Sequence, residues 1–333
     1  MKKRCARKCM QASLIALAFA LSLLKPGPAF ALEFPDRAVT IVAAFAPGAL
    51  ADVFARLMAE RLQDRLGQPF VVENKAGVGQ LVGTLSVIRS DPDGHTILLA
   101  AQAAFAGNVT LYQNLPYDPE KDLTPLYLVA KAPQVLLVNA DLPINSLANL
   151  IEYAKSHPNQ LTFGSTGPGT APGLAGEMLK RQANIELNHI HYRSFATALN
   201  DLTGGHIKLM FTDLLNAGSL ARGGKVRMIG VATPHRIEQF PDLPTLTELG
   251  LANFDMAAWF MFAVPAKTPS EITERLYSEM RSIMREDDVK RKFVQNGLIP
   301  IDSPSPAELK TFVASEIKRW GQIIRHAGIA GTK

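Results

Sequence analysis

Residues 39–52 read VTIVAAFAPGALAD, and this stretch decides the fold that the rest of the sequence predicts. Val39 to Phe45 is apolar and partly β-branched, which is typical of a strand buried on both faces. The Pro-Gly pair at 47–48 ends that run, and from Leu50 apolar residues recur at helical spacing until Gly67. Such a strand-turn-helix unit aims N–H groups and the positive end of a helix dipole at one point, which favours an anion. Most such units in α/β proteins bind nothing, so the stretch alone leaves both alternatives open.

The first 31 residues have the three parts of a secretory signal peptide. Five basic residues come first, an apolar segment at 12–24 follows, and Ala29-Phe30-Ala31 is an A-x-A cleavage site. The apolar segment is too short to span a membrane. We therefore expect cleavage after Ala31, a mature chain that begins at Leu32, and localisation in the periplasm.

The composition of the mature chain excludes several kinds of function. The signal peptide carries six of the 35 basic residues and none of the 30 acidic ones, so the mature chain is nearly neutral. This balance does not predict the basic surface that nucleic acid requires. Both cysteines, Cys5 and Cys9, lie in the signal peptide. We therefore expect no disulfide, no cysteine nucleophile and no thiolate metal site in the mature chain, and we expect no metal or other cofactor.

The order of the predicted elements indicates an α/β fold. Strands at 39–45, 70–73 and 96–101 alternate with helices, which is the signature of a parallel sheet with crossover helices. An apolar stretch at 127–139 predicts a strand that crosses into a second lobe, and another at 256–264 predicts the return.

Two crossings between two α/β lobes predict a hinged cleft, which a ligand closes if it binds the closed state more tightly. We expect lobe 1 to comprise residues 32–131 together with 258–333, and lobe 2 to comprise residues 132–257. The mature chain is long enough for two lobes of ordinary size.

A second strand-turn-helix unit occurs in the predicted lobe 2. Its turn, Ser165-Thr166-Gly167-Pro168-Gly169-Thr170, precedes a helix for which Thr170 is a candidate N-cap. The backbone N–H and hydroxyl groups of this turn could bind a carboxylate or phosphate, although an ordinary glycine turn has the same composition. Because a similar turn occurs in each lobe, ligand binding is the favoured interpretation.

Three other patterns give weaker signals. GVGQLVG at 77–83 is one residue away from the dinucleotide fingerprint and follows the second strand rather than the first. Gly164-Ser165-Thr166-Gly167 lacks the first glycine of the serine-hydrolase elbow. His189 and His191 share one face of a strand, but Glu186, the only acidic residue near them in sequence, is offset toward the other face. Structural histidines are therefore expected rather than a metal site.

Two acidic residues stand where a cleft would lie. Asp52 is in the first turn of a predicted helix, where it could line the cleft or only compensate the helix dipole. Because its carboxylate repels an anion, we expect it to meet a donor or ammonium group of a ligand. Asp213 follows a predicted strand at its carboxyl end, the edge at which ligands bind in open α/β sheets.

Short motifs follow one another in a consistent order from about residue 33 to the C-terminus. They are FPDR at 34–37, FAPG at 45–48 with Asp52, GQP at 67–69, VVEN at 71–74, DPDG at 91–94, LPYD at 115–118, GS at 164–165 with Gly167, GT at 169–170, LAGE at 174–177 and PDLPT at 241–245. These motifs resemble those of the Bug-type periplasmic receptors, the solute-binding subunits of tripartite tricarboxylate transporters.

The resemblance implies a two-lobed periplasmic-binding-protein fold of the Venus flytrap type, with a small carboxylated ligand held between the lobes. It implies a binding protein rather than an enzyme, which delivers its ligand to one small and one large membrane subunit; we expect a monomer. By position in these motifs and at the strand ends, the predicted ligand contacts in lobe 1 are Ala46, Gly48, Ala49, Asp52 and Gln102, and those in lobe 2 are Ser165, Thr166, Gly169, Thr170 and Asp213.

The sequence departs from the family pattern in these same regions. Ala49 replaces a glycine, Phe105 and Gly173 replace frequent histidines, Ser194 replaces a glycine, and Thr212 takes the place of an aspartate, with Asp213 next to it. Together these changes predict a pocket of altered shape and more apolar character. We therefore expect a carboxylate with an aromatic or aliphatic body rather than a citrate-like triacid.

Two alternatives stay open at the level of sequence. A periplasmic serine hydrolase would use Ser165 and would need a histidine within hydrogen-bond reach of its hydroxyl. A sensory receptor would present its ligand to a membrane signalling protein, and no residue distinguishes it from a transport receptor. For a binding protein, we expect Ser165→Ala and Asp52→Ala to weaken ligand affinity while stability without ligand stays near wild type.

Overall fold

The first strand-turn-helix unit has the form that its sequence predicts. In a computed structural model that describes residues 34–333, β1 (Val39–Ala43) leads into α2 (Leu50–Leu66). Gly67 ends the helix at φ 74°, in the left-handed region where glycine suffers no Cβ clash, and its N–H donates to the carbonyl of Gln63. The predicted signal peptide lies outside the described residues.

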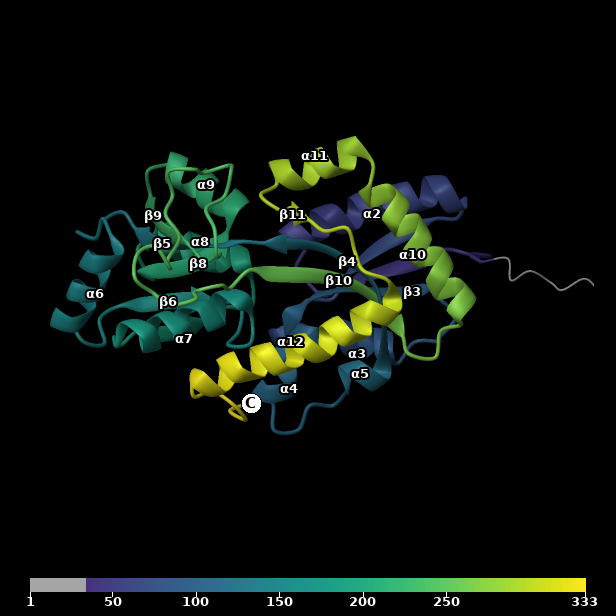
Figure 1. Cartoon of the computed structure of the whole chain (residues 1–333), viewed down its shortest axis with the longest axis horizontal. Coiled ribbons are helices and arrows are strands. Elements are labelled where there is room, and N and C mark those ends of the chain that lie inside the picture. Colours follow the sequence, from purple (N-terminus) through teal and green to yellow (C-terminus); the bar gives the residue numbers. More distant parts are fainter. Residues whose placement is uncertain (1–33) are drawn as a thin grey trace, which may run out of the picture. The chain divides into compact units, whose positions relative to one another are not determined.

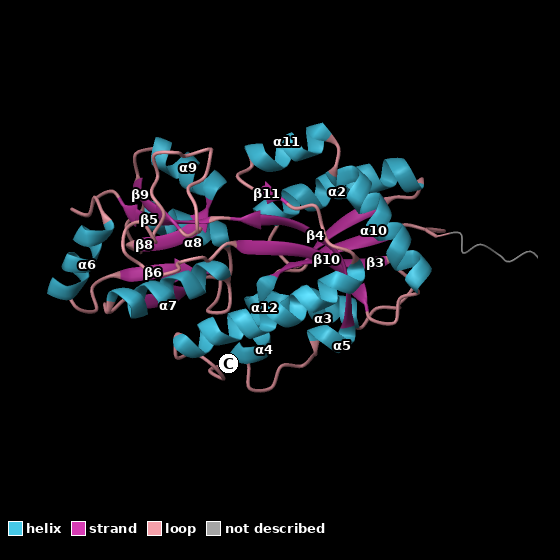
Figure 2. Cartoon of the chain, in the orientation of Figure 1, coloured by secondary structure: helices cyan, strands magenta, loops and turns pink. Residues whose placement is uncertain are grey.

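Residues 37–333 form one unit that contains two β-sheets (Figures 1 and 2). The first sheet has the strand order β11-β4-β10-β3-β1-β2. β1 pairs in parallel with β2 and β3, whereas β10 runs antiparallel to β3 and β4. Its other strands are β2 (Phe70–Asn74), β3 (Thr96–Ala101), β4 (Leu123–Ala132), β10 (Ala258–Pro265) and β11 (Ile299–Pro300).

The second sheet has the strand order β7-β6-β8-β5-β9. β6 pairs in parallel with β7 and β8, and β5 runs antiparallel to β8 and β9. These strands are β5 (Gln134–Asn139), β6 (Thr162–Ser165), β7 (Asn188–His191), β8 (Leu209–Asp213) and β9 (Val226–Val231).

Helices cover both sheets. Figure 1 shows α2 and α10 on one face of the first sheet, with α3 and α12 on the other. Packed with the first sheet are η1 (Val78–Gln80), α3 (Leu81–Ile88), the π-helix η2 (Ala103–Gly107), α4 (Asn108–Leu111), α5 (Pro119–Asp122), α10 (Ser270–Met284), α11 (Asp287–Gln295) and α12 (Pro306–His326). The second sheet carries α6 (Leu147–Ser156), α7 (Ala171–Ala183), α8 (Phe195–Thr203) and α9 (Leu214–Arg222). Within residues 34–333, none of these helices is both long and apolar enough to span a lipid bilayer.

The predicted crossing stretch at 127–139 consists of two strands. β4 ends at Ala132 in the first sheet and β5 begins at Gln134 in the second. Pro133 between them has no N–H group with which to continue a ladder. The return lies at the start of the predicted stretch 256–264, because β10 begins at Ala258 and lies wholly in the first sheet. The chain returns just before it, where the N–H of Met256 donates to the carbonyl of Ala232.

The central strand of the first sheet is tied to the C-terminal helix by one carboxylate. All eight residues of β10 are buried. The indole N–H of Trp259 donates to Glu316 Oε2 of α12 at 2.6 Å, and that of Trp320 donates to the same oxygen at 2.7 Å. Arg319 adds a weaker contact at 3.4 Å. One carboxylate oxygen therefore accepts the indole hydrogen bonds of two buried tryptophans.

Candidate functional site

A cavity of about 550 Å³ lies where the turns after the strands of the first sheet meet strand ends of the second. Both predicted turns contribute to its wall, as does the crossing region near Gln134. Seven of the predicted ligand contacts line it, namely Ala46, Gly48, Ala49, Gln102, Thr166, Thr170 and Asp213. The structure thus brings residues that are more than 150 positions apart in sequence to one cavity.

The other three predicted contacts, Asp52, Ser165 and Gly169, are not part of the cavity wall. A Cβ placed on Gly169 would lie 2.8 Å from the Leu111 side chain, so this position faces α4. Ser165 is fully buried beneath its turn, and Asp52 is 4 % exposed. Any effect of these three residues on a ligand would act through the turns that they hold.

Asp52 holds the first turn in place. Its carboxylate accepts hydrogen bonds from the Gly48 N–H at 2.9 Å and from the Asn74 side-chain amide at 2.9 Å, and it pairs with Arg56 at 3.0 Å. Burial raises the pKa of Asp52, but the hydrogen bonds from Gly48, Asn74 and Arg56 and the Arg56 charge outweigh burial and hold the pKa below its usual value. The carboxylate is therefore ionised and belongs to the architecture of the turn.

We expect Asp52→Ala to lower the free energy of unfolding by about 1–3 kcal/mol, because it leaves the Gly48 and Asn74 donors without their acceptor. This replaces the sequence-based expectation of unchanged stability. The folded-state pKa is depressed, so the contribution is present above the unfolded pKa and is lost as pH falls through the folded pKa. Urea unfolding at pH 7 and at about pH 3 measures the loss of stability and its dependence on pH. Glu60→Ala, an exposed change on the same helix, is the control; equal stability of the two variants at pH 7 would contradict the assignment.

The two turns offer different sets of donors. Because the Gly48 N–H is taken by Asp52, the free donors of the first turn are the helix N-terminal N–H groups of Leu50 and Ala51, which line the cavity. In the second turn Pro172 has no N–H, and the Gly173 N–H donates to the Thr170 hydroxyl at 3.3 Å.

The Ala171 N–H therefore remains free in the second turn. The Thr166 hydroxyl adds a donor, because it has no hydrogen-bond partner among residues 34–333 and Thr166 lines the cavity. The second turn thus depends more on a hydroxyl group than the first does.

Sequence reasoning missed the segment that follows β7. Tyr192, Arg193 and Ser194 all line the cavity. Arg193 is exposed and forms no ion pair with any of residues 34–333. Ser194, which replaces a glycine of the family pattern, forms no side-chain hydrogen bond within the same residues. The signal was available, because β7 is parallel to β6 and residues at the carboxyl ends of parallel strands meet at the ligand edge.

Asp213 and Gln134 form a polar part of the wall at the crossing. Asp213 caps α9 and accepts hydrogen bonds from the Asn216 N–H at 3.0 Å and its side-chain amide at 2.8 Å. Burial raises the pKa of Asp213. In this chain the aspartate stands one residue later than in the family pattern. Asp213 is therefore an N-cap that lines the cavity, whereas Thr212, in the place of the family aspartate, is fully buried. Gln134, also missed from sequence, donates to the Ala132 carbonyl at 2.9 Å.

The rest of the cavity is largely apolar. Its large apolar side chains include Phe45 from the turn after β1, Phe260 from β10, and Phe195 and Leu199 from α8. Phe105 is not part of the wall, since it is buried against Trp259 with ring centroids 5.8 Å apart. The family departure at Phe105 therefore affects the core beside the cavity rather than the cavity surface.

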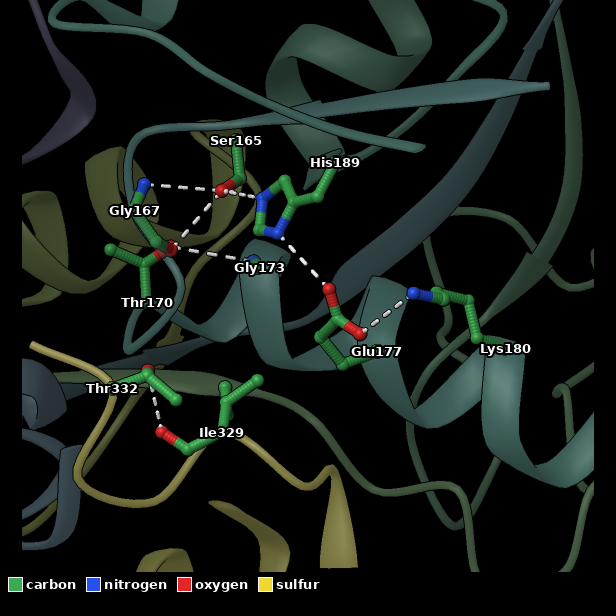
Figure 3. Close-up of polar contacts among 9 residues, drawn as sticks. All are labelled: Ser165, Gly167, Thr170, Gly173, Glu177, Lys180, His189, Ile329 and Thr332. Atoms are coloured by element: carbon green, nitrogen blue, oxygen red, sulfur yellow. Dashed lines mark hydrogen bonds and ion pairs between the residues drawn. The ribbon is translucent and has the colours of Figure 1, made fainter. Parts of the chain in front are cut away.

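Behind the second turn, Ser165 is hydrogen-bonded to a histidine (Figure 3). Ser165 Oγ lies 2.7 Å from His189 Nε2, and His189 Nδ1 lies 3.2 Å from Glu177 Oε1. The acidic partner is thus Glu177 of α7 and not Glu186, which corrects the sequence-based survey of nearby acids. Within the described chain, no group of three histidine, cysteine, aspartate or glutamate side chains could hold a metal ion.

This geometry meets the requirement set for a serine hydrolase, a histidine within reach of Ser165. However, Ser165 has no exposed surface and does not line the cavity. Its hydroxyl also contacts the Gly167 N–H and carbonyl, each at 3.1 Å. A nucleophile must reach its substrate, so in this arrangement the serine and histidine serve to hold the turn.

Two α/β sheets linked by a pair of crossings, with a cavity between their turns, define the class of two-lobed periplasmic binding proteins. Residues 54–329 match the family model for the Tripartite tricarboxylate transporter family receptor. The chain belongs to this family and is a Bug-type solute-binding receptor.

Relatives support this placement over nearly the whole chain. BugT of Bordetella pertussis is 32 % identical over 302 residues, covering 90 % of this chain and 92 % of its own. The structure of R. palustris Rpa4515 with adipate has a TM-score of 0.85 at 32 % identity, and covers 89 % of this chain and 99 % of its own. MatC of Rhodopseudomonas palustris, with bound malate, has a TM-score of 0.82 at 30 % identity, covering 87 % and 100 %.

Proposed function

We propose that this receptor captures a small carboxylated organic compound in the periplasm and delivers it to a tripartite tricarboxylate-type membrane transporter. The observation that carries the proposal is the cavity that both turns line, with Gly48 and Ala49 from the first turn and Thr166 and Thr170 from the second. Helix N-termini at both turns favour an anionic group between them. All ten predicted contacts remain part of the proposal, with Asp52, Ser165 and Gly169 acting through the turns.

The proposed ligand has an apolar body and one or two carboxylates. Aromatic and aliphatic side chains form much of the wall, and a body of this kind would bury apolar surface against them. Arg193, which has no ion-pair partner within the described residues, is placed to meet a second carboxylate. The adipate and malate held by the two related structures are both dicarboxylates.

Tryptophan fluorescence titration against aromatic and aliphatic mono- and diacids tests this ligand class. Trp259 lies between the cavity residues Ala258 and Phe260, so a ligand should perturb its emission. We expect adipate-like acids to bind more tightly than citrate. Arg193→Gln should weaken diacid binding by about tenfold, the effect of losing a charge-assisted hydrogen bond, and leave monoacid binding unchanged. Binding of citrate-like triacids alone would refute the proposed ligand class.

The lobes are proposed to divide as the sequence predicts, with residues 132–257 as lobe 2 between two crossings. The end of β4 at Ala132 and the start of β10 at Ala258 support these limits. The signal peptide is proposed to be removed after Ala31. We further propose a monomer that docks with one small and one large membrane subunit.

Delivery to a transporter is proposed over presentation to a signalling protein because of the receptor family to which the chain belongs. A pull-down of membrane partners, together with ligand uptake in a deletion strain, separates the two. We propose no catalytic role. Incubation with chromogenic acyl esters should give no hydrolysis above that of the Ser165→Ala variant, whereas turnover that depends on Ser165 would favour the hydrolase.

A further inference from the structure

The chain of hydrogen bonds behind the second turn joins three elements, and its residues do not line the cavity. Ser165 ends β6, His189 lies in β7, and Glu177 lies in α7. Figure 3 shows the histidine ring between the serine hydroxyl and the carboxylate, with Lys180 on the far side of the carboxylate at 3.3 Å. His189 is the only link in this chain whose ring offers two nitrogen atoms, each of which can donate or accept a hydrogen bond.

The Ser165 hydroxyl has three polar neighbours but only one proton. The Gly167 N–H donates to it at 3.1 Å, the Gly167 carbonyl at 3.1 Å can only accept, and His189 Nε2 lies at 2.7 Å. When His189 is neutral with its proton on Nδ1 toward Glu177, Nε2 and the Gly167 carbonyl compete for the hydroxyl proton. When His189 is protonated, Nε2–H donates to Oγ and the hydroxyl proton is free for the carbonyl. As long as Nδ1 keeps its proton for Glu177, only the doubly protonated ring satisfies all three contacts at once.

Two ionisable side chains contact His189, the Glu177 carboxylate on α7 and the His191 ring on β7. Burial raises the pKa of Glu177, but the hydrogen bond to His189 and the charge of Lys180 outweigh burial and hold it below the usual value, so the carboxylate is anionic. On β7 the His191 ring lies 4.2 Å from the His189 ring, centroid to centroid. Burial lowers the pKa of His191, and the charges of His189 and Lys333 lower it further. The Glu177 carboxylate can only accept, so it places a proton on His189 Nδ1 while its other oxygen pairs with Lys180.

We propose that His189 is a positioning residue for ligand binding, and that its proton sets the direction of the hydrogen bond at Ser165 and hence how firmly the Thr166–Gly167 peptide is held. Thr166 lies between Ser165 and Gly167 and lines the cavity. The protonated state holds the turn by one more hydrogen bond, so it is better preorganised. Ligand affinity should therefore fall about fivefold, the equivalent of one net hydrogen bond, as His189 loses its proton. Only this last consequence rests on the proposed function.

Nuclear magnetic resonance of the ligand-free protein tests the switch directly. The side-chain nitrogens of His189 and the backbone amide of Gly167 are followed from about pH 5 to pH 9, the range that contains histidine titration. We expect the Gly167 amide to titrate together with the His189 ring in the wild type and in the control His191→Gln. In Ser165→Ala the ring should still titrate while the Gly167 amide no longer follows it.

A Gly167 amide that ignores the His189 titration, or that still follows it in Ser165→Ala, would overturn the proposal. If Ser165→Ala does not fold, His189→Gln gives the same test, since its Gly167 amide should be independent of pH. Calorimetric titration with adipate then tests the ligand consequence. Affinity should fall about fivefold with rising pH in the wild type and stay constant in His189→Gln. Failure to bind adipate at any pH would count against the proposed ligand class, while the amide titration decides the switch.

Discussion

Gly173→Ala should disrupt the ligand-binding turn of lobe 2 and lower ligand affinity at least tenfold. A Cβ on Gly173 would lie 2.2 Å from the Gly167 carbonyl oxygen and 3.0 Å from Ser165 Oγ. Backbone cannot give way as a flexible side chain can, so the 165–170 turn must move off the α7 N-terminus. We expect a loss of about 1–3 kcal/mol in the free energy of unfolding, the usual cost of forced overpacking. Chemical denaturation and calorimetric titration with adipate measure the two effects.

The matched control for this variant is Gly223→Ala, in the C-cap of α9. A Cβ there would come no closer than 3.3 Å, to the Leu220 carbonyl, and its backbone angles suit alanine. This variant should stay within about 0.5 kcal/mol of wild type, as surface changes usually do. If Gly173→Ala were as stable and bound as tightly as Gly223→Ala, the turn would not be packed as described. The same contact explains why this chain cannot carry the histidine that the family pattern favours at 173.

Glu316→Ala should cost about 3–5 kcal/mol of stability, because it leaves two buried indole donors without an acceptor. Trp259 and Trp320 are each at most 1 % exposed, so water cannot replace the carboxylate without opening the core. They are the only tryptophans in the chain. Urea unfolding followed by their fluorescence therefore reports directly on the site that the substitution alters.

Glu316→Gln provides the matched comparison for that loss. Its amide oxygen can still accept from both indoles, while the weaker contact with Arg319 loses its charge. We expect this variant to lose only about 1 kcal/mol, the worth of a weakened surface-facing ion pair. Equal losses for the alanine and glutamine variants would show that the carboxylate does not hold the tryptophans. Because β10 also carries the cavity residues Ala258 and Phe260, Glu316→Ala should weaken ligand binding as well.

Local sequence patterns predicted most of the elements of this fold. The strand at Thr96–Ala101 has the predicted limits, and Thr170 is the predicted N-cap of α7, whose side chain accepts from the Gly173 N–H. These features depend on residues near each other in sequence, such as turn formers, caps and apolar periodicity. The two apolar crossing stretches, at 127–139 and 256–264, predicted the two-lobed arrangement, and the family motifs pointed to the same fold.

The roles of individual site residues depend on contacts that sequence spacing does not show. Glu177 meets His189 only because α7 packs against β6 and β6 pairs with β7, and no sequence period relates residues of two different elements. The sequence predicted Asp52 as a cleft residue. In the structure its carboxylate accepts hydrogen bonds from Asn74 of the next strand and from the Gly48 N–H, so it stabilises the turn. Arg193 was missed because an isolated arginine forms no motif, and only its place after the carboxyl end of a parallel strand could have indicated the cavity.

The central claim is that the two turns hold a carboxylate between them. It is tested most directly by calorimetric titration with adipate, its monoamide and its diamide. The monoamide and the diamide have the same carbon chain as adipate. They replace one or both of its carboxylates with a neutral amide. The account predicts one site per chain, tight binding of adipate, and at least tenfold weaker binding of the diamide, because helix N-termini and Arg193 favour negative charge. Equal binding of adipate and its diamide, or binding of neither acid nor amides by a protein that is fully folded, would contradict it.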